Sequence, residues 1–203
     1  FVGGGSDLPA YYSENVGAVV STTINKFVYV TVNKKFEDNI RLSYSQTENV
    51  TRASEIIHPI VRNALEIMSI DKGIEVTSIS DIPSRGTGLG SSSSFSVALL
   101  HALHAFQNKI IAKQDLGGLA CMLEMEKCLA PIGKQDQFAA AFGGLNFMQF
   151  YPDGTVSVEP ITCSEGTKAH LNESIICFYT GRTRSASDIL QAQSENLNRS
   201  EIV

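Results

Sequence analysis

Strand-like and helical patterns of apolar residues follow one another in the first part of the chain. A short helix is predicted over 8–13, and residues 16–32 are rich in Val, Thr, Ile and Tyr with the alternation typical of strands. Pro59 opens a run of apolar residues at helical spacing that reaches Met68, and proline is tolerated at the first position of a helix. The segment GIEVTSIS, residues 73–80, is predicted to be a strand.

The second part of the chain begins with two helical patterns and continues with a hairpin. Apolar residues recur at helical spacing over 95–106 and again over 116–123. The turn sequence YPDGT separates the predicted strands 145–150 and 156–160. Because helices and hairpins are interspersed without a regular βαβ repeat, the pattern favours an α+β fold over a doubly wound sheet.

The polar stretch 163–168 is the one predicted domain boundary, which divides the chain into 1–162 and 163–203. Beyond it, a strand is predicted over 173–180 and a last helix from about Ser185. The chain has no initiator methionine and both ends are abrupt, so we expect a fragment that lacks a first strand.

Composition narrows the function to a protein that binds a small ligand. The 203 residues carry a formal charge of −5, which gives no broad basic surface for nucleic acid. No apolar stretch approaches the roughly 20 residues of a membrane helix, and no signal peptide opens the chain, so we expect a cytoplasmic protein that contacts no membrane. The four cysteines form no CxxC pair and are predicted to be reduced, namely Cys121, Cys128, Cys163 and Cys177.

Residues 82–100, IPSRGTGLGSSSSFSVALL, join a predicted strand to a predicted helix. A helix N-terminus exposes unpaired N–H groups and a partial positive charge, and glycines let the backbone approach an anion. Gly86, Gly88 and Gly90 would allow that approach, and the four serines that follow would supply hydroxyls. The alternative is a tight turn in which Ser92 or Ser93 caps the helix.

Known phosphate-binding loops can be compared with this segment in turn. The Walker pattern is absent because no lysine follows the last glycine. The dinucleotide fingerprint fails on its spacing, and the next acidic residue, Asp115, starts a helix instead of ending a strand. A protein-kinase loop would lie between two strands and be followed by HRD and DFG, which this sequence lacks.

The segment resembles the central motif of the GHMP kinases, P-x-G-x-G-L-G-S-S-A-A, with one extra residue after Pro83 and serines in place of the alanines. GGGSDLPAYY resembles the first motif of that family, whose aspartate is here Asp7. EMEKCLAPIGKQDQFAAAFGG resembles the galactokinase segment with a glutamate seven residues before a proline and an aspartate five after it, here Glu124, Pro131 and Asp136. The three matches occur in the family's order and span the chain.

The resemblance implies a GHMP kinase fold, with an N-terminal ribosomal-protein-like α/β domain over 1–162 and the start of a ferredoxin-like C-terminal domain over 163–203. It implies ATP-dependent phosphorylation of a small molecule, with a homodimer left open. FVGGGSDLPAYY, GLGSSSSF, PIGKQDQFAAA and YTGRTRSASDIL are most similar to sugar 1-kinases that act on D-glycero-D-manno-heptose 7-phosphate, in bacterial lipopolysaccharide biosynthesis.

Two other activities stay open. One is a galactokinase-like or fucokinase-like kinase of a neutral sugar, although GGGSDL replaces the galactokinase signature GEHTDY. The other is a non-catalytic module that binds a sugar phosphate or a nucleotide. The family's third glycine-rich motif and a basic residue before the first motif lie outside the chain, so we expect little activity from these residues alone.

The resemblance also implies which residues act. Asp136 would orient or deprotonate the anomeric hydroxyl, and Ser92 with Glu124 would ligate Mg²⁺. The sugar would contact Gly5, Ser6, Asp7 and Asp136, with Arg182 and Arg184 on its distal phosphate. The ATP phosphates would contact Arg85, Gly86, Thr87, Gly88, Leu89, Gly90, Ser91, Ser92 and Ser93.

Each role has a simpler alternative. Glu126 lies two residues from Glu124 and would point off its face, but both could belong to a solvated helix face. Asp136 could be a helix cap or a first-turn acid. Lys134 could lower the pKa of Asp136 or contact phosphate, or be a solvated lysine. The arginines could be ordinary surface residues, and His101 with His104 resembles a metal pair but has no third ligand.

Overall fold

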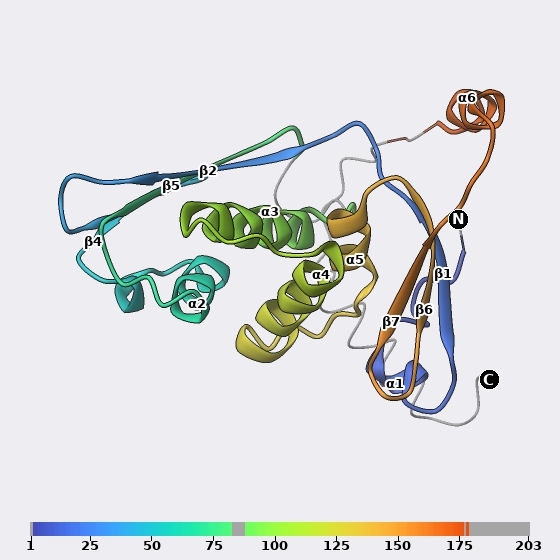
Figure 1. Ribbon diagram of the computed structural model, residues 1–203, viewed down its shortest axis with the longest axis horizontal. Coiled ribbons are helices and arrows are strands. Elements are labelled where there is room, and N and C mark those ends of the chain that lie inside the picture. The colour runs from blue at the N-terminus through green and yellow to red at the C-terminus, as the bar shows by residue number, and fades with distance from the viewer. Residues whose placement is uncertain (1, 83–87, 177, 179–203) are drawn as a thin grey trace.

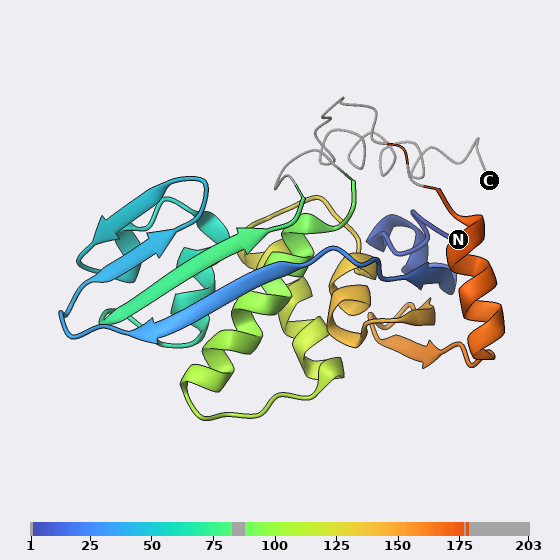
Figure 2. The same ribbon diagram turned by 90° about the horizontal axis from the view of Figure 1, so that it is seen from above.

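The computed structural model describes residues 2–82, 88–176 and 178. Two β-sheets flank a group of helices (Figure 1). A four-stranded sheet lies across one side of the helices, and a three-stranded sheet stands at their other end (Figures 1 and 2). None of the helices in this described part is long and apolar enough to cross a membrane.

The four-stranded sheet has the order β2-β5-β3-β4. β2 (Val28–Lys34) pairs antiparallel with β5 (Ile74–Ser80), which pairs parallel with β3 (Ile40–Ser43). β3 pairs antiparallel with β4 (Thr47–Val50). The strand at 73–80 is confirmed, whereas the sequence analysis made no assignment for β3 and β4, which are too short for a clear alternation.

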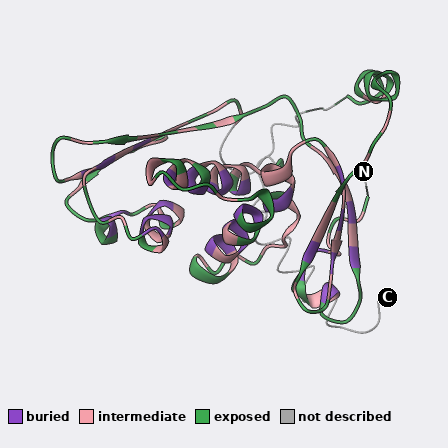
Figure 3. Ribbon diagram, viewed as in Figure 1, coloured by how far each residue is buried: buried purple, intermediate pink, exposed green. Residues whose placement is uncertain are grey.

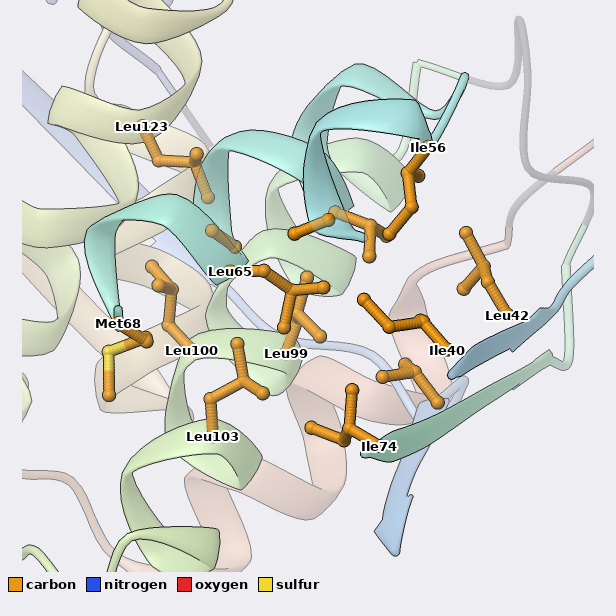
Figure 4. Packing of buried hydrophobic residues seen from close by; sticks show 14 of the residues in the cluster. Ile40, Leu42, Ile56, Leu65, Met68, Ile74, Leu99, Leu100, Leu103 and Leu123 are labelled. Carbon is orange, nitrogen blue, oxygen red and sulfur yellow. The ribbon is translucent and has the colours of Figure 1, made fainter. Parts of the chain in front are cut away.

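The main hydrophobic core lies between this sheet and two helices, α2 (Pro59–Ile67) and α3 (Ser91–Phe106). Both helices are confirmed, and Pro59 occupies the start of α2 as predicted. The buried side of α3 faces the sheet (Figure 3). A one-turn 3-10 helix, η1 (Ala53–Glu55), leads into α2. Side chains from both layers interlock in this core, among them Ile40, Leu42, Ile74, Leu65, Met68, Leu99, Leu100 and Leu103 (Figure 4).

The second sheet is antiparallel, with the order β1-β6-β7. β1 (Gly17–Thr22) precedes β2, so the predicted strand region 16–32 is divided between two sheets. The predicted hairpin is confirmed as β6 (Leu145–Phe150) and β7 (Val156–Pro160). The short helix α1 (Pro9–Tyr12) is also confirmed. A separate small core forms here from Tyr12, Val19, Cys121, Phe138, Met148, Phe150 and Val156.

Three helical segments connect the two cores. α4 (Lys113–Cys121) continues directly into η2 (Met122–Lys127), which is a π-helix, and a loop leads on to α5 (Gln135–Phe142). In η2 the N–H of Cys128 bonds to the carbonyl oxygen of Leu123, five residues earlier, at 3.0 Å. Cys121, Cys128 and Cys163 are free, and the reduced state of the cysteines stays a prediction.

The segment after β7 differs from the prediction. α6 (Glu165–Ser174) occupies part of the predicted polar boundary, because the Ser164 hydroxyl caps it by accepting the Thr167 N–H at 3.0 Å. The strand predicted over 173–180 is wrong at its start, where Glu173 and Ser174 end this helix. The predicted last helix from Ser185 lies outside the described residues, and the boundary at 163 stays a prediction.

Candidate active site

Two glycines shape the start of α3. Gly88 and Gly90 both have φ of +67°, a left-handed conformation that L-residues with a side chain adopt only with strain. Gly90 is the N-cap of α3, and its carbonyl oxygen accepts the N–H of Ser94 at 2.9 Å. The predicted serine cap is therefore wrong, because the residue at the N-cap position has no side chain. No side-chain cap bond occurs at this N-terminus among the described residues, and the start of a helix is suited to bind an anion.

Asp136 lies beside this helix start. It is in the first turn of α5, where Lys134 occupies the N-cap position. A Cβ placed on Gly90 would lie 3.2 Å from Asp136 Cγ and 3.3 Å from its Oδ2. The N-terminal ends of two helices thus meet with a carboxylate between them. The absence of a side chain at Gly90 leaves room for that carboxylate.

Asp7 holds the start of α5 in place. Its Oδ2 accepts the N–H of Gln135 at 3.0 Å and its Oδ1 accepts the N–H of Gly5 at 3.2 Å. The side chain is 2% exposed. Any side chain at Gly133 would overlap the Asp7 carboxylate, so a glycine is required there. Asp7 therefore positions Asp136 across 129 residues of sequence by fixing the backbone of its neighbour.

Ser6 is engaged with the main chain. Its Oγ lies 2.7 Å from the carbonyl oxygen of Gly3 and 3.0 Å from that of Ala18, and it accepts the N–H of Ala18 at 3.0 Å. These bonds fasten the glycine turn to β1. Gly5 has φ of +93°, so the turn needs glycine at that position too. The two residues shape the loop that carries Asp7.

Ser92 and Glu124 meet between α3 and η2. The Ser92 hydroxyl donates to Oε1 of Glu124 at 2.6 Å, and Gln137 Nε2 donates to Oε2 at 2.7 Å. Glu124 is 2% exposed, whereas Glu126 is exposed. The interpretation of both glutamates as a solvated helix face is therefore wrong for Glu124, and Glu126 points off its face as predicted.

The π-helix η2 sets the direction of the Glu124 side chain. A π-helical turn carries one more residue than an α-helical turn, so it changes the direction of the side chains that follow and is frequent at functional sites. The apolar spacing up to Leu123 is regular and predicts an ordinary helix here. Glu124 points toward Ser92 because of this turn and the packing of η2 against α3.

Negative charge accumulates around Asp136. Asp136 is exposed, and its carboxylate lies close to the backbone at Gly90. Desolvation, followed by the negative charges of Asp7 and Glu124, raises the pKa of Asp136 to about 6. Burial also raises the pKa of Asp7, against the opposing effect of the backbone N–H groups that it accepts. Asp136 therefore titrates close to neutral pH.

Lys134 does not neutralise this cluster. Its Nζ donates to the carbonyl oxygen of Gly154 at 2.6 Å and lies 4.8 Å from the centre of the Tyr12 ring. These contacts tie the start of α5 to the turn between β6 and β7. The alternative in which Lys134 lowers the pKa of Asp136 is not supported, because burial and the charges of Asp7 and Glu124 raise that pKa.

The remaining residues singled out from the sequence lie away from the carboxylates, at the start of α3 or outside the described part of the chain. His101 is exposed, and Nδ1 of His104 lies 2.7 Å from the carbonyl oxygen of Leu100 in the same helix. Leu89 is 43% exposed next to Gly90. Ser91 starts α3, and Ser93 is buried in its first turn. The predicted contacts outside the described residues are Arg85, Gly86, Thr87, Arg182 and Arg184.

The donor set at Ser92 and Glu124 fits a hard divalent cation. A hydroxyl and a carboxylate oxygen stand 2.6 Å apart, and Mg²⁺ is held in proteins by few oxygen ligands together with water and substrate phosphates. The amide oxygen of Gln137, Oε1, is also buried and has no hydrogen-bond partner among the described residues. The residues present thus suit magnesium more than a metal that prefers nitrogen or sulfur ligands.

Comparisons with known proteins agree with this geometry. Residues 52–144 match the sequence profile of the GHMP kinases N terminal domain. The chain is 29% identical over 202 residues to D-glycero-alpha-D-manno-heptose 7-phosphate kinase of Campylobacter jejuni, a match that covers 92% of this chain and 58% of the relative. It is 24% identical over 213 residues to the bifunctional fucokinase/GDP-fucose pyrophosphorylase of Arabidopsis thaliana, covering 94% of this chain and 20% of that protein.

The fold matches solved structures as well. A crystal structure described as a D-glycero-D-manno-heptose 1-phosphate kinase from Bacteriodes thetaiotaomicron superposes with a TM-score of 0.81 at 24% identity, covering 98% of this chain and 68% of that one. Lactococcus lactis galactokinase superposes with a TM-score of 0.62 at 19% identity, covering 78% and 45%. The predicted α+β fold with a GHMP kinase N-terminal domain is confirmed. The three motifs and the profile match agree, and residues 52–144 of the chain are a GHMP kinases N terminal domain.

Proposed function

We propose that the protein transfers the γ-phosphoryl group of ATP to the anomeric hydroxyl of a sugar phosphate, D-glycero-D-manno-heptose 7-phosphate, to give the 1,7-bisphosphate. The observation that carries this proposal is the meeting of the α3 start, the Ser92 and Glu124 oxygens and the Asp136 carboxylate in one site. Phosphoryl transfer needs a phosphate cradle, charge neutralisation and a group that addresses the nucleophile, and in this proposal the residues gathered here would supply each of them.

The N–H groups at the start of α3 would bind phosphate oxygens, with Gly88 and Gly90 allowing close approach. Ser92 and Glu124 would hold Mg²⁺, which neutralises charge on the transferred group when bound. Asp136 would accept the proton of the attacking hydroxyl. With a pKa raised to about 6 it is mostly ionised at pH 7, and still basic enough to take a proton in the transition state.

The heptose substrate is the finer part of the proposal and rests on the Campylobacter relative, whose printed name describes that activity. In this proposal residues 163–203 begin the second domain, and Arg182 with Arg184 binds the distal phosphate. A neutral sugar is the second candidate, favoured by the galactokinase of Pyrococcus furiosus, which is 32% identical over 117 residues and matches 58% of this chain.

A binding module without turnover is the third candidate. The intact set of Asp7, Ser92, Glu124 and Asp136 favours a working enzyme, since a module that only binds has no need of a carboxylate beside the phosphate loop. The chain covers 58% of the length of the Campylobacter relative, so activity is tested on the natural full-length protein.

The test measures ADP release with ATP and Mg²⁺ in the presence of heptose 7-phosphate, galactose or fucose, with Asp136→Asn as the control. Release that depends on heptose 7-phosphate and is lost in the variant supports the proposal. Release with a neutral sugar instead identifies the second candidate. Sugar or nucleotide binding by calorimetry with no ADP release identifies the binding module.

A further inference from the structure

Gln137 is a buried polar residue, and the family motifs assign no role to it. It lies in α5 directly after Asp136, and its side chain is fully buried. Its Nε2 donates to Oε2 of Glu124 at 2.7 Å. A buried polar side chain in a small domain needs a reason, because burying an unpaired polar atom is unfavourable.

The orientation of the Gln137 amide is set by its partner. An ionised carboxylate can only accept, so the amide must turn its NH₂ group toward Glu124. The opposite atom, Oε1, then has no hydrogen-bond partner among the described residues. An apolar residue of similar volume would avoid this unpaired oxygen, so the glutamine serves the packing of α5 poorly. What it does supply is a donor to Glu124.

Glu124 depends on that donor. Its two oxygens are held from two sides, Oε1 by the Ser92 hydroxyl of α3 and Oε2 by Gln137 of α5. No ion pair of Glu124 occurs among the described residues. Without Gln137, the buried carboxylate would keep one fixed oxygen and could rotate about its Cγ–Cδ bond. The position of the Glu124 oxygen that faces Ser92 would then be less well defined.

We propose that Gln137 is a positioning residue for the metal-binding pair Ser92 and Glu124. It holds Oε2 so that Oε1 is presented beside the Ser92 hydroxyl, and it sets the distance between α5, which carries Asp136, and η2, which carries Glu124. This inference rests on the proposed function. Replacing a residue that hydrogen-bonds to a metal ligand and orients it typically lowers metal affinity by about 10- to 100-fold.

The test compares two glutamine variants that each lose one hydrogen bond. Gln137→Leu removes the donor to Glu124, while Gln114→Leu removes a donor to the carbonyl oxygen of Val156, which is 2.7 Å away on β7. Mn²⁺ serves as the probe, and its binding to the natural full-length protein with a non-hydrolysable ATP analogue is followed by electron paramagnetic resonance. Thermal melting shows which variants are folded. Gln137→Asn, which keeps the amide on a shorter stem, replaces Gln137→Leu if the latter does not fold.

We expect Gln137→Leu to weaken Mn²⁺ binding by about 10- to 100-fold and Gln114→Leu to leave it unchanged. Glu124→Gln is measured in parallel to test the metal site itself. If Glu124→Gln weakens binding and the folded Gln137 variant does not, Gln137 only fills space, and the proposed function stands without it. If neither substitution affects Mn²⁺ binding, the metal lies elsewhere and both the inference and the proposed role of Glu124 are wrong.

Discussion

Replacing Asp136 by asparagine should make the protein more stable and much less active. Asparagine keeps the size of the side chain and removes its charge. In the folded protein desolvation, followed by the negative charges of Asp7 and Glu124, raises the pKa of Asp136 from 3.8 to about 6. Since one pKa unit corresponds to about 1.4 kcal/mol, the unfavourable free energy of the ionised form would be about 3 kcal/mol if the site were fully shielded.

Two corrections reduce this value. Asp136 reaches solvent, so screening lowers the effect to about 2 kcal/mol. The charge also interacts favourably with the N-terminus of α5, which is worth about 0.3 to 1 kcal/mol and is lost in the variant. The net gain at neutral pH is about 1 kcal/mol. For a chain of this length that raises Tm by roughly 2 to 4 °C.

The sign of the effect follows from proton linkage. A folded-state pKa above the unfolded value means that the folded wild-type protein binds more protons between pH 3.8 and about 6, so its stability falls as the pH rises through that interval. The variant lacks this loss. The difference in Tm between variant and wild type should be near zero at pH 4, grow up to about pH 6 and stay constant above it.

The assay is thermal unfolding in buffers from pH 4 to pH 8. Asp115→Asn is the control, because Asp115 is also a first-turn acid, in α4, and is exposed. Its removal should give no gain in stability. In the same preparation, kcat of Asp136→Asn should fall by about 10²- to 10⁴-fold with little change in KM for ATP. A variant that is no more stable than wild type at pH 7.5, or whose kcat is near normal, would refute the reasoning.

Four further substitutions test other parts of the site. Gly90→Val should abolish ATP binding measured by calorimetry, because valine fits poorly at φ of +67° and would block approach to the helix start; unchanged affinity in a folded variant would make the loop a simple turn. Glu124→Gln should lower kcat, and a higher Mg²⁺ concentration should partly restore it. A loss of kcat that does not respond to Mg²⁺ would show that Glu124 is not a metal ligand. Gly133→Ala should lower Tm by several degrees, since the new Cβ would overlap the Asp7 carboxylate, and an unchanged Tm would contradict that contact. Arg182→Ala should raise KM for heptose 7-phosphate about 10-fold and leave a neutral sugar unaffected, whereas an equal loss for both would exclude phosphate recognition.

Much of the architecture follows from local sequence patterns. Apolar residues recur at helical spacing in α2 and α3 and with strand-like alternation in β5, so each pattern predicts its element. Pro59 marks the start of α2 because its φ is fixed near the helical value. The hairpin of β6 and β7 follows from its turn residues. The phosphate-loop motif and the acids Asp7, Glu124 and Asp136 could also be identified, because family motifs preserve residue types at fixed spacing.

Other features depend on contacts between segments far apart in the sequence. The hairpin of β3 and β4 is too short to show a period, and it forms because β3 pairs with β5. No local pattern signals the π-helical turn at Glu124, since its direction is set by packing against α3. The sequence leaves Lys134 open between an effect on the pKa of Asp136, a phosphate contact and a solvated position, and the fold turns its side chain toward the carbonyl oxygen of Gly154.

The contacts of Asp7 and Gln137 also separate what the sequence predicts from what depends on the packing of distant segments. The resemblance of the sequence motifs to the GHMP kinases implies that Asp7, Glu124 and Asp136 belong near the phosphate loop. The packing of the helices brings Asp7 to the backbone N–H of Gln135 and Gln137 to Glu124. It also desolvates Asp136 and brings Asp7 and Glu124 near it, which raises the pKa of Asp136. The physical reason is that hydrogen bonds and Coulomb interactions depend on distances in space, and those distances are set when the helices pack.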